Sequence, residues 1–188
     1  MWLDFNNDGF KDIFTANGNV IDNAEFISSR KSRQPNTVFI NRGDGTFRVQ
    51  NLPGEGFHRG AAFGDFNRDG KIDVAVTRLN DSPLLLWNQT AQAGHWIELQ
   101  LIGNRSNRDG IGAWIHLVSA SGEQWNRMNT SVGYGYSADR IMHFGLGKGT
   151  SAKMIQIDRP SGTKQRLQNV QANRLIVIEE SHESHEVH

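Results

Sequence analysis

Residues 4–14 read DFNNDGFKDIF, and residues 65–75 read DFNRDGKIDVA. The second stretch repeats the first 61 residues further along the chain. In each copy a loop rich in Asp and Asn, with one Gly, leads directly into a short apolar run, and this composition is typical of a turn before a strand. A single repeat of this size cannot bury both of its faces, so the pattern indicates a fold built from stacked sheet-like units.

Both loops carry the side chains of a calcium site. The pattern D-x-N-x-D-G-x-x-D puts oxygen-bearing side chains at loop positions 1, 3, 5 and 9, and Ca²⁺ takes about six to eight oxygen ligands. A backbone carbonyl at position 7 adds one more, and the Gly at position 6 lets the backbone turn toward the same ion. The predicted ligands are Asp4, Asn6, Asp8, Phe10 and Asp12 in the first loop, and Asp65, Asn67, Asp69, Lys71 and Asp73 in the second.

The loops differ from an EF-hand, which has a bidentate Glu at position 12 and helices on both sides. Position 12 is Thr15 in the first loop and Val76 in the second, and the flanking residues favour strands. The alternative interpretation is an Asx-rich turn that only solvates a strand junction. Three carboxylates within one short loop repel one another without a cation, which favours the metal interpretation.

The rest of the chain is typical of an all-β protein. Ile97, Leu99 and Leu101 alternate with polar residues, which is the period of a half-buried strand. Only residues 21–29 weakly resemble a helix. Strands are predicted at 12–16, 37–41, 46–50, 60–64, 73–79, 83–88, 95–102, 113–118, 123–130, 141–145, 153–158, 164–168 and 174–179.

The pattern of the chain changes near residues 91–94, where the Asp-rich loops stop and regular alternation begins. We therefore predict a repeat segment over residues 1–90 and a separate small antiparallel β-sandwich over residues 95–178. The last ten residues, 179–188, read EESHESHEVH, and their low complexity predicts a disordered tail.

Composition excludes several classes of function. Lys plus Arg and Asp plus Glu both number 20, so the net charge is zero and favours neither nucleic acid nor an anionic membrane as a partner. The absence of Cys excludes disulfides, thiolate catalysis and Cys-ligated metals. No apolar run is long enough for a membrane span, and the N-terminus does not read as a signal peptide.

Together with NRGDGTF at residues 41–47, the two loops and the strands that follow them resemble FG-GAP/VCBS repeats. That family builds β-propellers, as in integrin α-subunit heads and many secreted bacterial proteins. The resemblance implies that residues 1–90 form partial propeller blades with structural Ca²⁺. Arg42, Gly43 and Asp44 within this stretch spell an integrin-recognition tripeptide, which we interpret as part of a hairpin turn.

The second half resembles the ASPIC/UnbV domain, which follows such repeats in the cartilage acidic protein family and its bacterial relatives. The resemblance rests on SNRDGIGAWI at residues 106–115, GYSADRIMHFGLG at 135–147 and PSG at 160–162. Arg159 departs from the pattern, because the family usually has Trp before Pro-Ser-Gly. We expect this departure to weaken the packing there slightly.

We expect a secreted, extracellular-type interaction or adhesion module, with an extracellular protein or a glycan as its partner and no catalytic residues. One alternative is a propeller-based lyase or hydrolase, which would need titratable groups such as Asp139, Arg140 and His143 to converge in a pocket. Another alternative is a purely structural module that completes a larger assembly.

Propellers close with about four to eight blades, and this chain carries fewer than two. The first unit reaches its loop after only three residues, so we expect it to lack the strand that Gly60–Gly64 supplies in the second. Open strand edges invite pairing with another chain. We therefore expect a fragment of a longer propeller protein, or self-association through the N-terminal strand edge.

Overall fold

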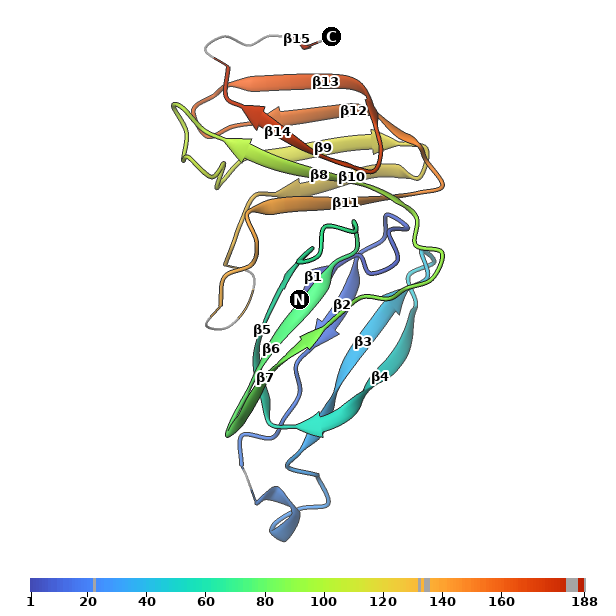
Figure 1. The fold of residues 1–188 in the computed structure, drawn as a ribbon, viewed down its shortest axis with the longest axis vertical. Helices are drawn as coiled ribbons and strands as arrows, with labels where there is room; N and C mark the ends of the chain where they lie inside the picture. The colour runs from blue at the N-terminus through green and yellow to red at the C-terminus, as the bar shows by residue number, and fades with distance from the viewer. Residues whose placement is uncertain (22, 132, 134–135, 182–185, 188) are drawn as a thin grey trace.

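The computed structural model describes residues 1–21, 23–131, 133, 136–181 and 186–187, and it is all-β apart from one short 3₁₀ helix (Figure 1). The elements of the first half are β1 (Trp2–Leu3), β2 (Asp12–Thr15), η1 (Ala24–Phe26), β3 (Gln34–Asn41), β4 (Phe47–Gly56), β5 (His58–Gly64), β6 (Asp73–Arg78) and β7 (Asp81–Leu86). Those of the second half are β8 (His95–Ile102), β9 (Trp114–Ser119), β10 (Gly122–Arg127), β11 (Ile141–Gly147), β12 (Ser151–Asp158), β13 (Lys164–Gln171), β14 (Arg174–Glu179) and β15 (Glu186–Val187).

The N-terminal unit consists of two antiparallel sheets, β1-β2-β3-β4 and β5-β6-β7. Apolar side chains from the facing surfaces of both sheets form one core, in which Phe14 and Val38 from the first sheet pack with Val74 and Val76 from the second. These residues alternate with more exposed ones along each strand, as a sheet buried on one face requires.

The two sheets are repeats of one unit. β1, β2 and β3 of the first sheet follow the same order as β5, β6 and β7 of the second, with the Asp-rich loop between the first two strands in each case. The first unit therefore does contain the strand that the sequence led us to expect only in the second. It is β1, and it pairs with β2 through Trp2 opposite Ile13.

The C-terminal unit is a sandwich of a five-stranded sheet, β10-β9-β12-β13-β15, and a three-stranded sheet, β11-β8-β14. Its core draws on both sheets, and Ile97, Leu99, Ile115, Phe144 and Ile157 are fully buried in it. The predicted antiparallel sandwich is confirmed, with two exceptions among its strand pairs, because β14 runs parallel to β8 and β15 parallel to β13. Between β13 and β14 the chain passes from the five-stranded sheet to the edge of the three-stranded one.

All thirteen predicted strands occur, β8 and β14 with the predicted ends and the others with shifted ends, and the weak helix signal at 21–29 corresponds only to η1. The predicted disordered tail is wrong at its start. Glu179 belongs to β14, Glu180 is buried, and Glu186–Val187 form β15. The rest of that predicted tail, 182–185 and 188, lies outside the described residues.

Figure 1 shows the two units end to end, so that the Asp-rich loops of the first unit face β8 and β11 of the second. Among the described residues, no helix has the length and apolar character needed to cross a membrane.

Candidate functional site

The first Asp-rich loop is held by its own acidic and amide side chains. Asp4 accepts the backbone N–H groups of Asp8 and Gly9 through its two carboxylate oxygens, at 3.1 and 2.9 Å. Asn6 Oδ1 accepts the same Asp8 N–H at 3.2 Å, and Asp8 Oδ1 accepts that of Phe10 at 2.8 Å. The side-chain oxygens of loop positions 1 and 3 therefore converge on the backbone N–H of Asp8.

The second loop reproduces this network bond for bond. Asp65 accepts the N–H groups of Asp69 and Gly70, at 3.1 and 2.6 Å. Asn67 Oδ1 accepts the Asp69 N–H at 3.1 Å, and Asp69 Oδ1 accepts that of Lys71 at 2.9 Å. The same local sequence thus gives the same local structure in both units.

The last acidic residue of each loop anchors the strands around it. Asp12 accepts the backbone N–H of Phe5 at 2.9 Å and that of Asn41, at the end of β3, at 2.8 Å. Asp73 accepts the N–H groups of Phe66 and Asn88 in the same way. Position 9 therefore ties the loop to the third strand of its own sheet.

The tight turn needs left-handed backbone conformations at positions 4 and 6 of each loop. Gly9 and Gly70 have φ values of 94° and 82°, and Asn7 and Arg68 have φ values of 58° and 59°. Gly takes this conformation without a Cβ clash, and Asn tolerates it better than most residues. Position 6 is Gly in both copies, as predicted.

The donor chemistry of the loops fits calcium. Asp and Asn oxygens are hard ligands, and each oxygen that accepts one N–H keeps a second lone pair. Within the described part of the chain, however, no three His, Asp or Glu side chains gather closely enough to hold a metal by themselves. A bound ion would therefore depend on the Asn6 and Asn67 amide oxygens, on the Phe10 and Lys71 carbonyls and on water, as well as on the carboxylates.

Burial disfavours the charged form of the loop carboxylates. It raises the pKa of Asp4 to about 6 and also raises the pKa of Asp12 and Asp73. Two lysines partly offset the negative charge: Lys11 lies in the electrostatic range of Asp4 and Asp12, and Lys71 Nζ stands 3.2 Å from Asp69 Oδ2. A divalent cation would remove the remaining repulsion.

The first loop forms part of the junction between the two units. The buried Asn7 side chain donates to Gly70 O of the second loop at 2.9 Å and to Gly94 O of the linker at 3.2 Å. Asn7 O accepts the N–H of Gly147 in β11 at 2.7 Å. Gly145, also in β11, leaves room for the loop, since a Cβ there would lie 2.2 Å from Asp4 Oδ2.

The second loop packs on the C-terminal unit just as closely. A Cβ on Gly70 would lie 1.8 Å from Trp96 Nε1. The ring of Trp96 stacks on that of His143 at 6.5 Å between centroids and 17° between planes, and His143 Nε2 contacts Gly70 O at 3.1 Å. The HFGLG stretch at residues 143–147, a marker of the sequence resemblance, therefore docks onto both loops.

A cavity of about 330 Å³ lies beside this junction, and both units line it. Asp139 and His143 line it together with Asp4 and Lys11, whereas Arg140 does not and instead pairs with Asp109 at 2.9 Å. The three residues weighed for catalysis therefore do not converge. Burial lowers the pKa of His143 to about 3, so its imidazole is neutral near pH 7.

No sequence pattern indicated the role of Glu180. Its carboxylate accepts the backbone N–H groups of Asn104, Arg105 and Ser106 at 2.7–2.8 Å, and the hydroxyls of Ser106 and Ser161. These bonds hold the pKa of Glu180 well below its usual range, against the opposing effect of burial. They join the SNRDG and PSG stretches in one network.

Two other sequence features have simple structural settings. Arg42–Gly43–Asp44 form the exposed turn between β3 and β4, where Asp44 Oδ1 accepts the N–H of Thr46 at 2.9 Å. Arg159, in the place of the usual Trp, is buried and donates to Gln165 Oε1 and to Ile178 O, at 2.8 and 2.9 Å.

Comparison with known families divides the chain into the same two parts as the structure. The model of the FG-GAP-like repeat matches residues 4–76, which hold both Asp-rich loops and the strands after them. The ASPIC and UnbV model matches residues 103–185, which hold most of the sandwich. No curated protein matches the chain. The protein is therefore an FG-GAP-like repeat segment, built of β-propeller elements, followed by an ASPIC and UnbV domain.

Proposed function

We propose that the chain is a calcium-stabilised interaction module of an extracellular-type protein, with structural Ca²⁺ in the two Asp-rich loops. One observation carries the proposal: both loops make the same hydrogen bonds, and in each the oxygens of positions 1 and 3 converge. Six such bonds recur because the same donors and acceptors recur at the same spacing. The presence of the same carboxylate and amide oxygens at the same loop positions in both units supports ion binding.

The ions would act on architecture rather than on a substrate. The loops form the junction between the FG-GAP-like segment and the ASPIC and UnbV domain, so neutralising their carboxylates would stabilise both the loop and the docked domain. We propose no catalytic role for any residue. A partner outside the chain, either an extracellular protein or a glycan, would then bind a surface that calcium keeps rigid.

The test is a calorimetric titration of the chelator-treated protein with Ca²⁺, followed by thermal melts. We expect heat of binding and a gain of about 2.7 kcal/mol per independent site when free Ca²⁺ is a hundredfold above its Kd. Mg²⁺ should substitute poorly, because it prefers a tight octahedron and retains its waters. Absence of both heat and stabilisation would leave only the interpretation as a turn.

Loop variants separate ion binding from turn stability. Asp8→Ala and Asp69→Ala each remove one carboxylate that also accepts an N–H two residues later. Asp44→Ala is the matched control, since Asp44 accepts the N–H of Thr46 in the same way but lies outside the loops. We expect all three variants to lower the Tm slightly without calcium, and only the loop variants to lose the gain that calcium brings.

Lys71 provides a variant that should gain affinity. Its ammonium group pairs with Asp69 Oδ2 at 3.2 Å and competes with a cation for that oxygen. Because a partly exposed pair is worth roughly 0.2–1 kcal/mol, Lys71→Ala should tighten calcium binding at the second loop by up to about fivefold. Lys164→Ala, which removes an exposed lysine of β13 in the C-terminal unit, should leave the affinity unchanged.

Association through the N-terminal sheet is the second part of the proposal. Trp2, Ile13, Phe39 and Val49 lie opposite one another across all four strands of this sheet, on the face turned away from the shared core. Trp2 is 62% and Val49 59% exposed. Sedimentation velocity should detect self-association that Val49→Glu weakens and Phe26→Glu, at an exposed site far from the row, does not.

A further inference from the structure

The two repeated sheets differ by one strand. The first sheet has four strands, and β4 pairs with β3 along residues 47–56. The second sheet has three strands, and within the described residues β7 pairs only with β6. One long edge of β7 is therefore open at the place that β4 occupies in the first unit.

The point at which the repeats diverge is well defined. Asn41 and Asn88 are equivalent, because their backbone N–H groups donate to Asp12 and Asp73 at the same distance of 2.8 Å. After Asn41 the chain turns back and forms β4. After Asn88 it leaves through the linker and enters β8. In the second unit, the connection to the C-terminal unit therefore takes the place of a fourth strand.

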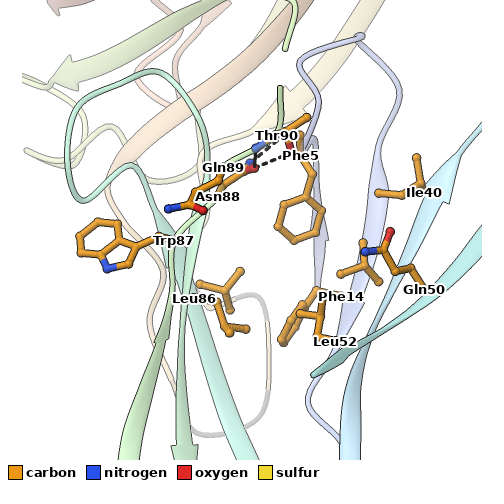
Figure 2. Close-up of a pocket in the computed structure, with 12 residues that line it drawn as sticks. Phe5, Phe14, Ile40, Gln50, Leu52, Leu86, Trp87, Asn88, Gln89 and Thr90 are labelled. Carbon is orange, nitrogen blue, oxygen red and sulfur yellow. Dashed lines mark hydrogen bonds between the residues drawn. The ribbon is translucent and has the colours of Figure 1, made fainter. Parts of the chain in front are cut away.

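A groove lies next to the open edge, where the missing strand would cover the core. Its volume is about 240 Å³, and most of its lining is apolar. Figure 2 shows Phe5, Phe14 and Leu52 from the side of the first sheet facing Leu86 from β7 across the open space. Gln50, on β4, lies along the wall of the first sheet.

We propose that the β7 edge and this groove accept an extended segment of another polypeptide as a fourth, antiparallel strand, with apolar side chains at alternate positions entering the groove. The antiparallel direction follows from β4, which runs antiparallel to β3. Pro83 in β7 has no backbone N–H, so the open edge offers its C=O group and the N–H and C=O groups of the other residues that face away from β6. Strand addition uses both this edge and the alternate pockets beside it.

A protein segment fits this groove better than a sugar does. Eight of the twelve lining residues are apolar, and of the polar ones Asn88 and Thr90 already bond each other. A glycan needs several polar partners for its hydroxyl groups. The proposal rests on the interaction role given above, but not on calcium.

The probe is a fluorescein-labelled synthetic octapeptide, Lys-Thr-Val-Thr-Val-Thr-Val-Lys, with Lys at the ends for solubility. We expect saturable binding to the full chain by fluorescence anisotropy. Two versions with N-methyl groups on alternate residues block one edge of the peptide each. One version should lose binding by at least about tenfold and the other should retain it, because only one edge pairs with β7. Equal binding by both versions would overturn the proposal.

The matched protein variants are Gln50→Trp and Lys153→Trp, each at an exposed residue of a strand. Gln50, on β4, lines the groove, whereas Lys153, on β12 of the C-terminal unit, does not, and neither change disturbs the core. Gln50→Trp should fill the groove and weaken peptide binding by about tenfold, and Lys153→Trp should leave it within about twofold. Equal effects of the two variants on peptide binding would contradict the proposal that the peptide lies in the groove.

The experiment is run with calcium and with chelator, below the melting temperature of the calcium-free protein. Peptide binding without any calcium response would overturn only the calcium proposal, and a calcium response without peptide binding would overturn only this one. Self-association that Gln50→Trp abolishes, with no peptide binding, would overturn it in favour of a second copy of the chain as the occupant.

Discussion

The Asn7 side chain donates a buried hydrogen bond to the carbonyl of Gly70, 63 residues away, and so joins the two Asp-rich loops directly. The same amide also reaches Gly94 O in the linker. Both loops and the start of the C-terminal unit are thus fixed by one side chain. Asn7 is position 4 of its loop, which no ligand pattern singles out.

Asn7→Asp should destabilise the protein, because an ionised carboxylate would face two carbonyl oxygens in place of an N–H donor. Gly94 O would lose this donor and Gly70 O would keep only its contact with His143 Nε2, and the loss of the two bonds should cost roughly 1–3 kcal/mol, measurable by urea denaturation at pH 7. Asn80→Asp is the control, since Asn80 also has a positive φ, of 56°, but is exposed in the β6–β7 turn. An equal effect of both variants would contradict the bridging role of Asn7.

Gly70→Ala tests the contact between the second loop and the C-terminal unit. The change places a Cβ against the Trp96 indole and forces Ala into a positive φ. Gly45→Ala imposes the same backbone cost at φ 85°, with nothing within 4 Å of the new Cβ. We expect Gly45→Ala to cost about 1 kcal/mol in the free energy of unfolding and Gly70→Ala about 1–3 kcal/mol more. A similar cost for both would show that Trp96 does not pack firmly on the loop.

The strands were predictable because apolar and polar residues alternate, with a period of two, along a strand that is buried on one face. Ile97, Leu99 and Leu101 alternate and are all buried in the sandwich core. Local turn chemistry was equally readable, as the left-handed Gly9 and Gly70 show. The parallel pairing of β14 with β8 was not, because period-two alternation carries no information on the direction of the neighbouring strand.

The junction could not be predicted for a related reason. The contacts of Gly145 with Asp4 and of His143 with Gly70 join residues far apart in the sequence. A sequence pattern shows that such glycines exist but not which backbone they approach. Glu180 was misassigned to a tail because its partners, at residues 104–106, lie more than seventy positions earlier.

Glu98 should make stability depend on pH between about 4.5 and 7. Its side chain is buried at the junction, where desolvation and the charges of Asp65 and Asp139 raise its pKa from 4.5 to about 7, while Arg68 acts in the opposite direction. Because the unfolded chain releases this proton first, the folded state loses stability as pH rises through that window and changes little above it. Glu98→Gln removes the ionisable group, so it should melt at a higher temperature than the wild type at pH 8.

At pH 5 the folded wild type holds Glu98 protonated, and the two proteins should melt at nearly the same temperature. Glu179→Gln, which changes an exposed glutamate in β14, should follow the wild type at both pH values. A wild-type melting temperature that does not fall relative to Glu98→Gln between pH 5 and pH 8 would show that Glu98 is not desolvated at the junction.

Glu180 should have the opposite dependence on pH. Its pKa is lowered in the folded state, so the stability it contributes is present above about pH 4.5 and is lost as the pH falls below that value. Glu180→Gln weakens bonds to three backbone N–H groups and should cost about 2–3 kcal/mol at pH 7. Urea midpoints at pH 7, 5, 4 and 3 should converge for the two proteins as the pH falls, because Glu180 becomes protonated in the unfolded wild type before it does so in the folded one. Glu179→Gln, at the exposed neighbouring residue, should match the wild type throughout, and an equal loss in that variant would assign the effect to charge at the end of β14 rather than to the bonds with residues 104–106.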